Sequence, residues 1–107
     1  MTDHDSLDRA AQLFRALGNE SRLKLISTLH AGPHTVSQLT ATTGSSQPLV
    51  SQHLKLLREV GIVIATRHGR ESYYEIADAH IANIVSDAVE HVSEASNHPP
   101  NTTEEES

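Results

Sequence analysis

Residues 46–76 read SQPLVSQHLKLLREVGIVIATRHGRESYYEI, and this stretch decides the fold. Its first half places apolar residues at the three- and four-residue steps of a helix. Its second half changes to β-branched and aromatic residues on either side of a Gly-containing turn, which is typical of a hairpin. Ser46 is a good N-cap and Gly61 is a good terminator. The sequence therefore predicts one helix over residues 46–60 and a short β-hairpin over residues 62–76.

Three shorter helices are predicted upstream of this stretch. Two helices joined by a short turn, the second followed by a hairpin, form a winged helix-turn-helix. The expected fold class is therefore mainly α with a small β-hairpin. In it, the helix just upstream supports the helix over 46–60, which is the expected recognition helix. The upstream helices are expected over residues 7–17, from a cap at Asn19 to the break at Gly32-Pro33, and over residues 35–42.

The composition bounds the class of protein. A chain of 107 residues with 36% hydrophobic content and three aromatic residues builds one small domain with a modest core, so burying more surface in a dimer would help it. The absence of cysteine removes disulfides, thiolate zinc sites and cysteine nucleophiles. No apolar run approaches the roughly 18 residues of a membrane span, and the N-terminus does not resemble a signal peptide. The expectation is a cytoplasmic protein without a membrane partner.

The formal charge of −6 is unevenly distributed along the chain. Residues 21–77 carry six Lys or Arg against three acids, whereas residues 78–107 carry seven acids and no Lys or Arg. The middle of the chain can therefore face phosphates while the acidic end faces away. The expected domains are a flexible N-terminus (1–6), a DNA-binding and dimerisation domain (7–95) and a disordered acidic tail (96–107).

The non-core face of the recognition helix and the hairpin turn supply candidate DNA contacts. Glutamine can bond an adenine edge bidentately, and serine or histidine can bond base edges or phosphate. Arginines at the hairpin tip can reach the DNA backbone or the adjacent minor groove. A polar helix face and a solvated turn are the alternative, and His53 could instead be a half-buried neighbour of the core. The candidates are Ser46, Gln47, Ser51, Gln52, His53, Lys55, Arg67 and Arg70.

Residues 78–94, DAHIANIVSDAVEHVSE, predict one further helix with an apolar stripe, and Asp78 is a good N-cap. A second stripe, containing His80, His91 and Glu94, falls within about 60° on the helix. His80 and His91 are about 16 Å apart along the helix axis. Metal ligands lie about 2 Å from the ion, so one straight helix cannot close these groups around a single ion.

An antiparallel copy of the same helix removes this difficulty. It lays the Asp78 and His80 end of one helix beside the His91 and Glu94 end of the other, so a two-fold axis makes two identical sites. Asp, His, His and Glu together form a tetrahedral set of nitrogen and oxygen ligands for zinc. The alternative is that both histidines are surface residues, that Glu94 is a solvated charge and that Asp78 is only a cap.

Three segments closely resemble the ArsR/SmtB family of bacterial metal-sensing repressors, and the resemblance covers roughly residues 7–95. They are FRALGNESRLKLISTL (14–29), SSQPLVSQHLKLLREVGIV (45–63) and RHGRESYYEI (67–76). The spacing of Asp78, His80, His91 and Glu94 also looks like the zinc-sensing site on the last helix of that family. The family's Cys-x-Cys site is absent, because the matching region reads TVSQLTAT, so sensing through thiolates is not expected.

The resemblance implies a homodimer that binds an inverted-repeat operator when metal-free and leaves it when Zn²⁺ binds, so that efflux or sequestration genes are derepressed. Ni²⁺ or Co²⁺ is the alternative effector, because six-coordinate relatives recruit further ligands from the chain ends, where His4 and His98 lie. A metal-independent DNA-binding regulator is a second alternative. A hydrolytic zinc enzyme is a third, and it is disfavoured because four protein ligands would close the coordination shell.

Overall fold

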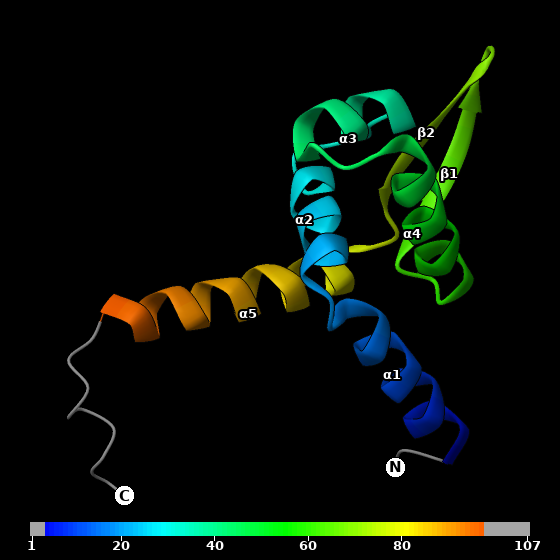
Figure 1. Ribbon diagram of the computed structural model, residues 1–107. Coiled ribbons are helices and arrows are strands. Elements are labelled where there is room, and N and C mark those ends of the chain that lie inside the picture. The colour runs from blue at the N-terminus through cyan, green and yellow to red at the C-terminus, as the bar shows by residue number, and fades with distance from the viewer. Residues whose placement is uncertain (1–3, 98–107) are drawn as a thin grey trace, which may run out of the picture.

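The computed structural model describes residues 4–97, and side-chain environments through Glu94. This part of the chain contains five helices and one antiparallel hairpin, and the hairpin projects at one side of the helices (Figure 1). The winged helix-turn-helix expected from the sequence is confirmed. The elements are α1 (His4–Leu17), α2 (Glu20–Leu29), α3 (Val36–Thr43), α4 (Gln47–Glu59), β1 (Val63–His68), β2 (Glu71–Ile76) and α5 (Ala79–Asn97).

The ends of the chain differ from the expected boundaries. Helix α1 begins at His4, three residues before its expected start at Leu7, so residues 4–6 are helical. Helix α5 runs to Asn97, beyond the expected end of the domain. The rest of the expected flexible N-terminus, residues 1–3, and the rest of the expected tail, residues 98–107, lie outside the described residues.

The helix-turn-helix is fixed by its caps and by the core beneath it. Thr35 and Gln38 form a capping box at the start of α3, Gly44 ends that helix with a φ of 75°, and Ser46 caps α4. A capping box satisfies two backbone donors that a helix start leaves unpaired, and Gly44 and Ser46 fix where α3 ends and α4 begins. The fully buried side chains beneath them are Leu25, Ile26, Leu39, Val50, Leu54, Leu57, Ile62 and Val63.

The hairpin is anchored at its base and projects at its tip. Strands β1 and β2 pair from Val63 opposite Ile76 to His68 opposite Glu71, so the turn is shorter than the sequence suggested. The loop before α3 adds to the base, because the His34 N–H donates to the Tyr74 carbonyl at 3.0 Å and the Tyr74 N–H donates to the His34 carbonyl at 2.8 Å. The wing is therefore tied to the helix-turn-helix, and its tip extends away from the helices (Figure 1).

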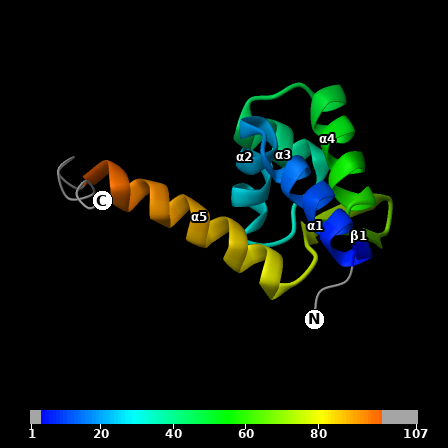
Figure 2. The same ribbon diagram turned by 90° about the horizontal axis from the view of Figure 1, so that it is seen from below.

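Helices α1 and α5 leave the body in different directions, and α5 points away from the wing (Figures 1 and 2). The Cα radius of gyration is 16.3 Å, compared with about 13 Å for a compact domain of about 100 residues. Both helices leave large apolar side chains in solvent: Leu7 is 59% exposed, Phe14 is 57% exposed and Val92 is 59% exposed. A single chain therefore leaves an apolar face on each of these helices.

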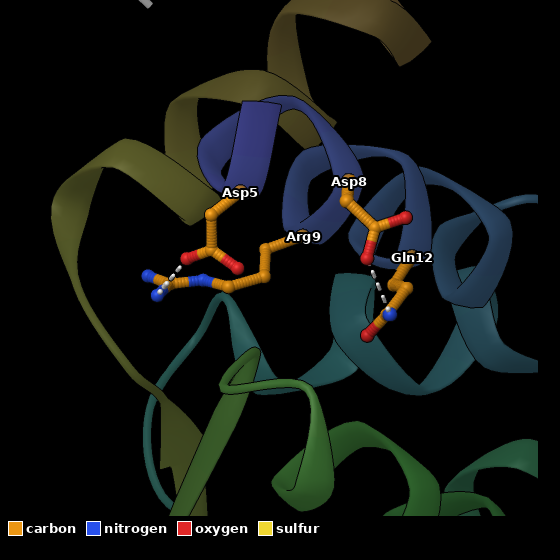
Figure 3. Close-up of polar contacts among 4 residues, drawn as sticks. All are labelled: Asp5, Asp8, Arg9 and Gln12. Carbon is orange, nitrogen blue, oxygen red and sulfur yellow. Dashed lines mark hydrogen bonds and ion pairs between the residues drawn. The ribbon is translucent and has the colours of Figure 1, made fainter. Parts of the chain in front are cut away.

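The opposite side of α1 is polar. Arg9 donates to Asp5 at 3.2 Å and Gln12 donates to Asp8 at 3.3 Å, as Figure 3 shows. These pairs lie roughly opposite Phe14 at about 100° of rotation per residue. Helix α1 is therefore amphipathic, with its polar face satisfied within the helix. In the described part of the chain, no helix is long and apolar enough to span a membrane.

Candidate functional site

The outward face of α4 carries a group of exposed polar side chains. Gln47, Ser51, Gln52 and Lys55 are all exposed. The last three fall within about 100° of one another on the helix, so they face the same way. The Ser46 hydroxyl accepts a hydrogen bond from the Leu49 N–H at 3.3 Å, which makes it the N-cap of α4. Ser46 thus presents a helix N-terminus, which favours an anion, beside the polar face.

His53 differs from the other candidates on α4. It is half-buried and lies on the flank of the helix rather than on the outward face. Burial, and to a smaller degree the nearby Arg22 guanidinium, lowers the pKa of His53 from its usual value of 6.5. The lowered pKa favours the neutral ring, which offers a DNA phosphate no charge.

The tip of the wing is cationic. Arg67 and Arg70 are both exposed. The Arg67 Nε donates to the Gly69 carbonyl at 3.0 Å, which holds that guanidinium at the turn. Behind them, the His68 and Tyr73 rings meet edge to face with centroids 5.4 Å apart, which stiffens the strands below the tip. The wing and α4 thus offer basic and polar side chains from two neighbouring elements (Figure 1).

The four candidate metal ligands lie along α5 and are all exposed. Asp78 precedes the helix, and its Oδ1 accepts the Ile81 N–H at 3.0 Å, so one carboxylate oxygen caps the helix while Oδ2 remains for another partner. Among the described residues, no three potential ligands gather to hold a metal ion. The donor types, two imidazoles and two carboxylates, suit a metal that prefers nitrogen and oxygen. One chain does not assemble them, so these residues can fit a metal only if the ligands are shared between chains.

Sequence reasoning counted Arg22 only as one of the positive charges. In the structure, its Nε donates to the Ala16 carbonyl at 2.6 Å and its Nη2 donates to the Arg15 carbonyl at 3.4 Å. It therefore caps the C-terminus of α1 from the first turn of α2. The available signal was the break at Gly18, because the last carbonyls of a helix need donors and Arg22 is the nearest cation after that break.

Comparison with known proteins identifies the family. Residues 19–65 match the family described as "Bacterial regulatory protein, arsR family". The chain is 44% identical to the HTH-type transcriptional repressor SmtB of Mycobacterium tuberculosis, over 82% of this chain and 65% of that protein, so it spans about 65% of that relative's length. It is 34% identical to the HTH-type transcriptional regulator NmtR of the same species, over 83% of this chain and 74% of that protein.

The fold comparison agrees with the sequence comparison. A homodimeric winged helix-turn-helix DNA-binding domain from Mycobacterium bovis, described as a possible ArsR-family transcriptional regulator, superposes with a TM-score of 0.84. The two share 28% identity, with 94% of each chain covered. The match extends well beyond the helix-turn-helix itself. This chain belongs to the arsR family of bacterial regulatory proteins.

Proposed function

We propose that this protein is a cytoplasmic, zinc-responsive transcriptional repressor and not an enzyme. As a metal-free homodimer it binds an inverted-repeat operator, and Zn²⁺ releases it, so that efflux or sequestration genes are derepressed. One observation carries the proposal: α5 presents Asp78 and His80 at one end and His91 and Glu94 at the other, all exposed and too far apart to meet in one chain. The SmtB relative is named a transcriptional repressor, which supports the same function for this chain.

Exposed apolar faces on α1 and α5 support a homodimer. Phe14 and Leu7 on α1, and Val89 and Val92 on α5, are exposed although they are large and apolar. Burying such side chains is worth about 1.5–3 kcal/mol each, so a second copy that covers both helices would gain substantially. The Mycobacterium bovis structure, described as homodimeric, supports this arrangement. Residues 7–95 would then form the DNA-binding and dimerisation domain.

The path from metal to DNA runs through the backbone. The N–H of Ala77, beside the ligand Asp78, donates to the Ile62 carbonyl at 2.9 Å. The Ile62 N–H in turn donates to the Leu57 carbonyl in α4 at 2.8 Å. The ligand end of α5 is thus bonded to the C-terminal end of the recognition helix. A metal shared between two α5 helices favours one mutual register, and this linkage lets that register bias the position of α4.

The alternatives differ in measurable ways. Ni²⁺ or Co²⁺ would recruit a further ligand, for which His4 is available as the exposed first residue of α1, whereas His98 lies outside the described residues. A metal-independent regulator would hold DNA equally with and without metal. A hydrolytic zinc enzyme would need an open coordination position, and an assay of ester or phosphoester hydrolysis with and without zinc separates it from a repressor.

Zinc titration of the operator-bound dimer tests the proposal. About one equivalent of Zn²⁺ per subunit is expected to release a fluorescent inverted-repeat operator, because each ion joins ligands from both chains and disfavours the DNA-bound register. Fluorescence anisotropy follows the release, and excess chelator should restore binding. Equal operator affinity in chelated and zinc-loaded samples would show that the protein is not a zinc sensor. Release by Ni²⁺ or Co²⁺ at lower concentration would transfer the role to those metals.

Substitutions on the wing and on α4 should have different signatures. Arg67→Ala or Arg70→Ala should weaken binding to every DNA sequence and flatten the salt dependence, by about 0.9 in the log–log slope for each phosphate that the variant no longer neutralises. Gln52→Ala should instead relax the preference at particular base pairs, at a cost of about 1–3 kcal/mol for a bidentate contact. Arg9→Ala, which changes an exposed arginine on α1, is the matched control and should do neither. If Gln52→Ala lowers the affinity for operator and for random DNA equally, Gln52 makes no sequence-specific base contact.

A further inference from the structure

We propose that Arg22 is a positioning residue that locks α1 to the helix-turn-helix and so sets the separation of the two recognition helices in the dimer. That Arg22 holds α1 against the helix-turn-helix is a statement about one chain and needs no dimer. That it sets the separation of the recognition helices rests on the operator-binding homodimer proposed above. Arg22 is assigned no contact with DNA or metal.

The contacts of Arg22 join two helices. Its guanidinium donates to the carbonyls of Ala16 at 2.6 Å and Arg15 at 3.4 Å, at the C-terminal end of α1. Its own backbone N–H donates to the Asn19 side chain at 2.9 Å, inside the N-cap of α2. Helix ends leave their last carbonyls unpaired, and a cation there also complements the helix dipole. One half-buried side chain therefore closes the end of α1 while its backbone is held at the start of α2.

The same side chain also lies near the recognition helix. Arg22 lines an open cavity of about 290 Å³ together with Leu56 and Val60 of α4 and with the last turn of α1. It also lies close enough to His53 on α4 for its charge to help lower the pKa of that histidine. Side chains of α1 and α4 therefore do not fill the space between the two helices at this point, and Arg22 lines that space from α2.

The hydrogen bonds made by Arg22 matter because only the C-terminal part of α1 packs against the rest of the chain. Among its side chains, all of which the structure describes, the buried ones are Ala16 and Leu17 at its C-terminal end. Leu13 is half-buried and packs against the core, whereas Leu7, nearer the N-terminus, and Phe14, on the outer face, are exposed. Helix α1 has 14 residues, so it is about 21 Å long, and a tilt of about 10° at the joint moves its far end by about 4 Å. In a dimer whose interface includes the apolar face of α1, such a tilt would shift the two recognition helices relative to each other. These helices must match half-sites about 34–36 Å apart.

The lock is tested by a distance within one chain. The sequence has no cysteine, so Asp8→Cys on α1 and Glu59→Cys on α4 create the only two sites for spin labels. Mixing labelled with excess unlabelled protein leaves at most one labelled chain in most dimers, so the measured distances lie within one chain. Arg22→Lys and Arg22→Gln are each expected to broaden the α1–α4 distance distribution measured by electron–electron double resonance. Lys24→Ala, an exposed cation on the same helix, is the matched control and should leave it unchanged. An unchanged distribution in both Arg22 variants would overturn the proposal.

DNA affinity then separates positioning from phosphate contact. Arg22→Lys keeps the charge but cannot present two fixed donors to two carbonyls. It should lower the affinity for the operator by about tenfold or more while leaving the affinity for random DNA nearly unchanged. Wild-type operator affinity in Arg22→Lys, or equal losses on both DNAs, would overturn the role in setting helix separation. If the wild type itself shows no operator preference, the proposed function fails, and the distance measurement still decides whether Arg22 locks α1.

The His53 ring gives a readout that a purely structural role would not move. Removing the guanidinium charge in Arg22→Gln should raise the pKa of His53 toward its usual value, because one of the two causes that lower it is gone. NMR titration of the His53 ring in the metal-free protein measures this. A pKa that stays where it is in the wild type would place Arg22 away from α4 in solution and contradict the proposed contact.

Discussion

Replacing either His80 or His91 with alanine is expected to abolish release from the operator by zinc while leaving metal-free operator binding intact. Both side chains are exposed on α5 and belong neither to the outward face of α4 nor to the tip of the wing, so their loss removes no proposed DNA contact and opens no cavity in the core. Each would supply one of four metal ligands. Four-ligand zinc sites bind with about 10–16 kcal/mol, so losing one ligand should weaken zinc binding by at least about 100-fold.

Two measurements on the same samples check this result. Competition with a chromophoric chelator gives the zinc affinity, and operator anisotropy gives the release. His30→Ala is the matched control, since it removes an exposed histidine at the end of α2 that is no proposed ligand. Zinc affinity that survives in both the His80 and the His91 variants would exclude the α5 site. If the His30 variant loses zinc instead, the ligands lie between α2 and α5.

The fold followed from local signals because those signals are strong here. Asn19, Ser46 and Asp78 were expected to cap helices, and each side chain accepts a backbone N–H in the structure. Thr35 was expected to begin its helix and is instead the N-cap. The boundaries that differed lie where local signals are weak. At the N-terminus, residues 4–6 extend α1 without an apolar residue to mark them, and at the wing the strands continue past the point where arginines suggested a turn.

The candidate site could be predicted only in part from the sequence. Periodicity shows which residues share one face of a helix, but not which other elements pack against that face. His53 follows Gln52 on the chain, but it lies on a different flank of α4, where it is half-buried and where burial and the nearby Arg22 lower its pKa. The hydrogen bonds from Arg22 to the end of α1 depend on where α1 lies relative to α2, and residue spacing does not predict that position. Helix α5 illustrates the same limit: Ile81 and Val85 are buried in their own chain, whereas Val89 and Val92 of the same apolar stripe are exposed.

Mixing the His80→Ala and His91→Ala variants, neither of which is expected to bind zinc tightly alone, is expected to restore one tight zinc site. In the proposed arrangement, Asp78 and His80 of one chain share each metal with His91 and Glu94 of the other, so His80→Ala alone and His91→Ala alone each spoil both sites of their homodimer. In a heterodimer of the two variants, one site loses both histidines. The other takes its intact first half from the His91→Ala chain and its intact second half from the His80→Ala chain.

The heterodimer therefore distinguishes shared ligands from ligands within one chain, which single substitutions cannot do. Two different affinity tags isolate it after subunit exchange, and the zinc stoichiometry is expected to be one tight ion per heterodimer. The parent homodimers, carried through the same exchange and purification, should hold none tightly. Mixing His80→Ala with Asp78→Ala is the matched negative control: both changes fall in the same half-site, so each of the two sites lacks one ligand and neither is whole. If the heterodimer forms but binds no zinc tightly, the ligands do not pair across the dimer. In that case the α5 register cannot be what zinc fixes, and the route from α5 through Ala77 and Ile62 to α4 loses its cause.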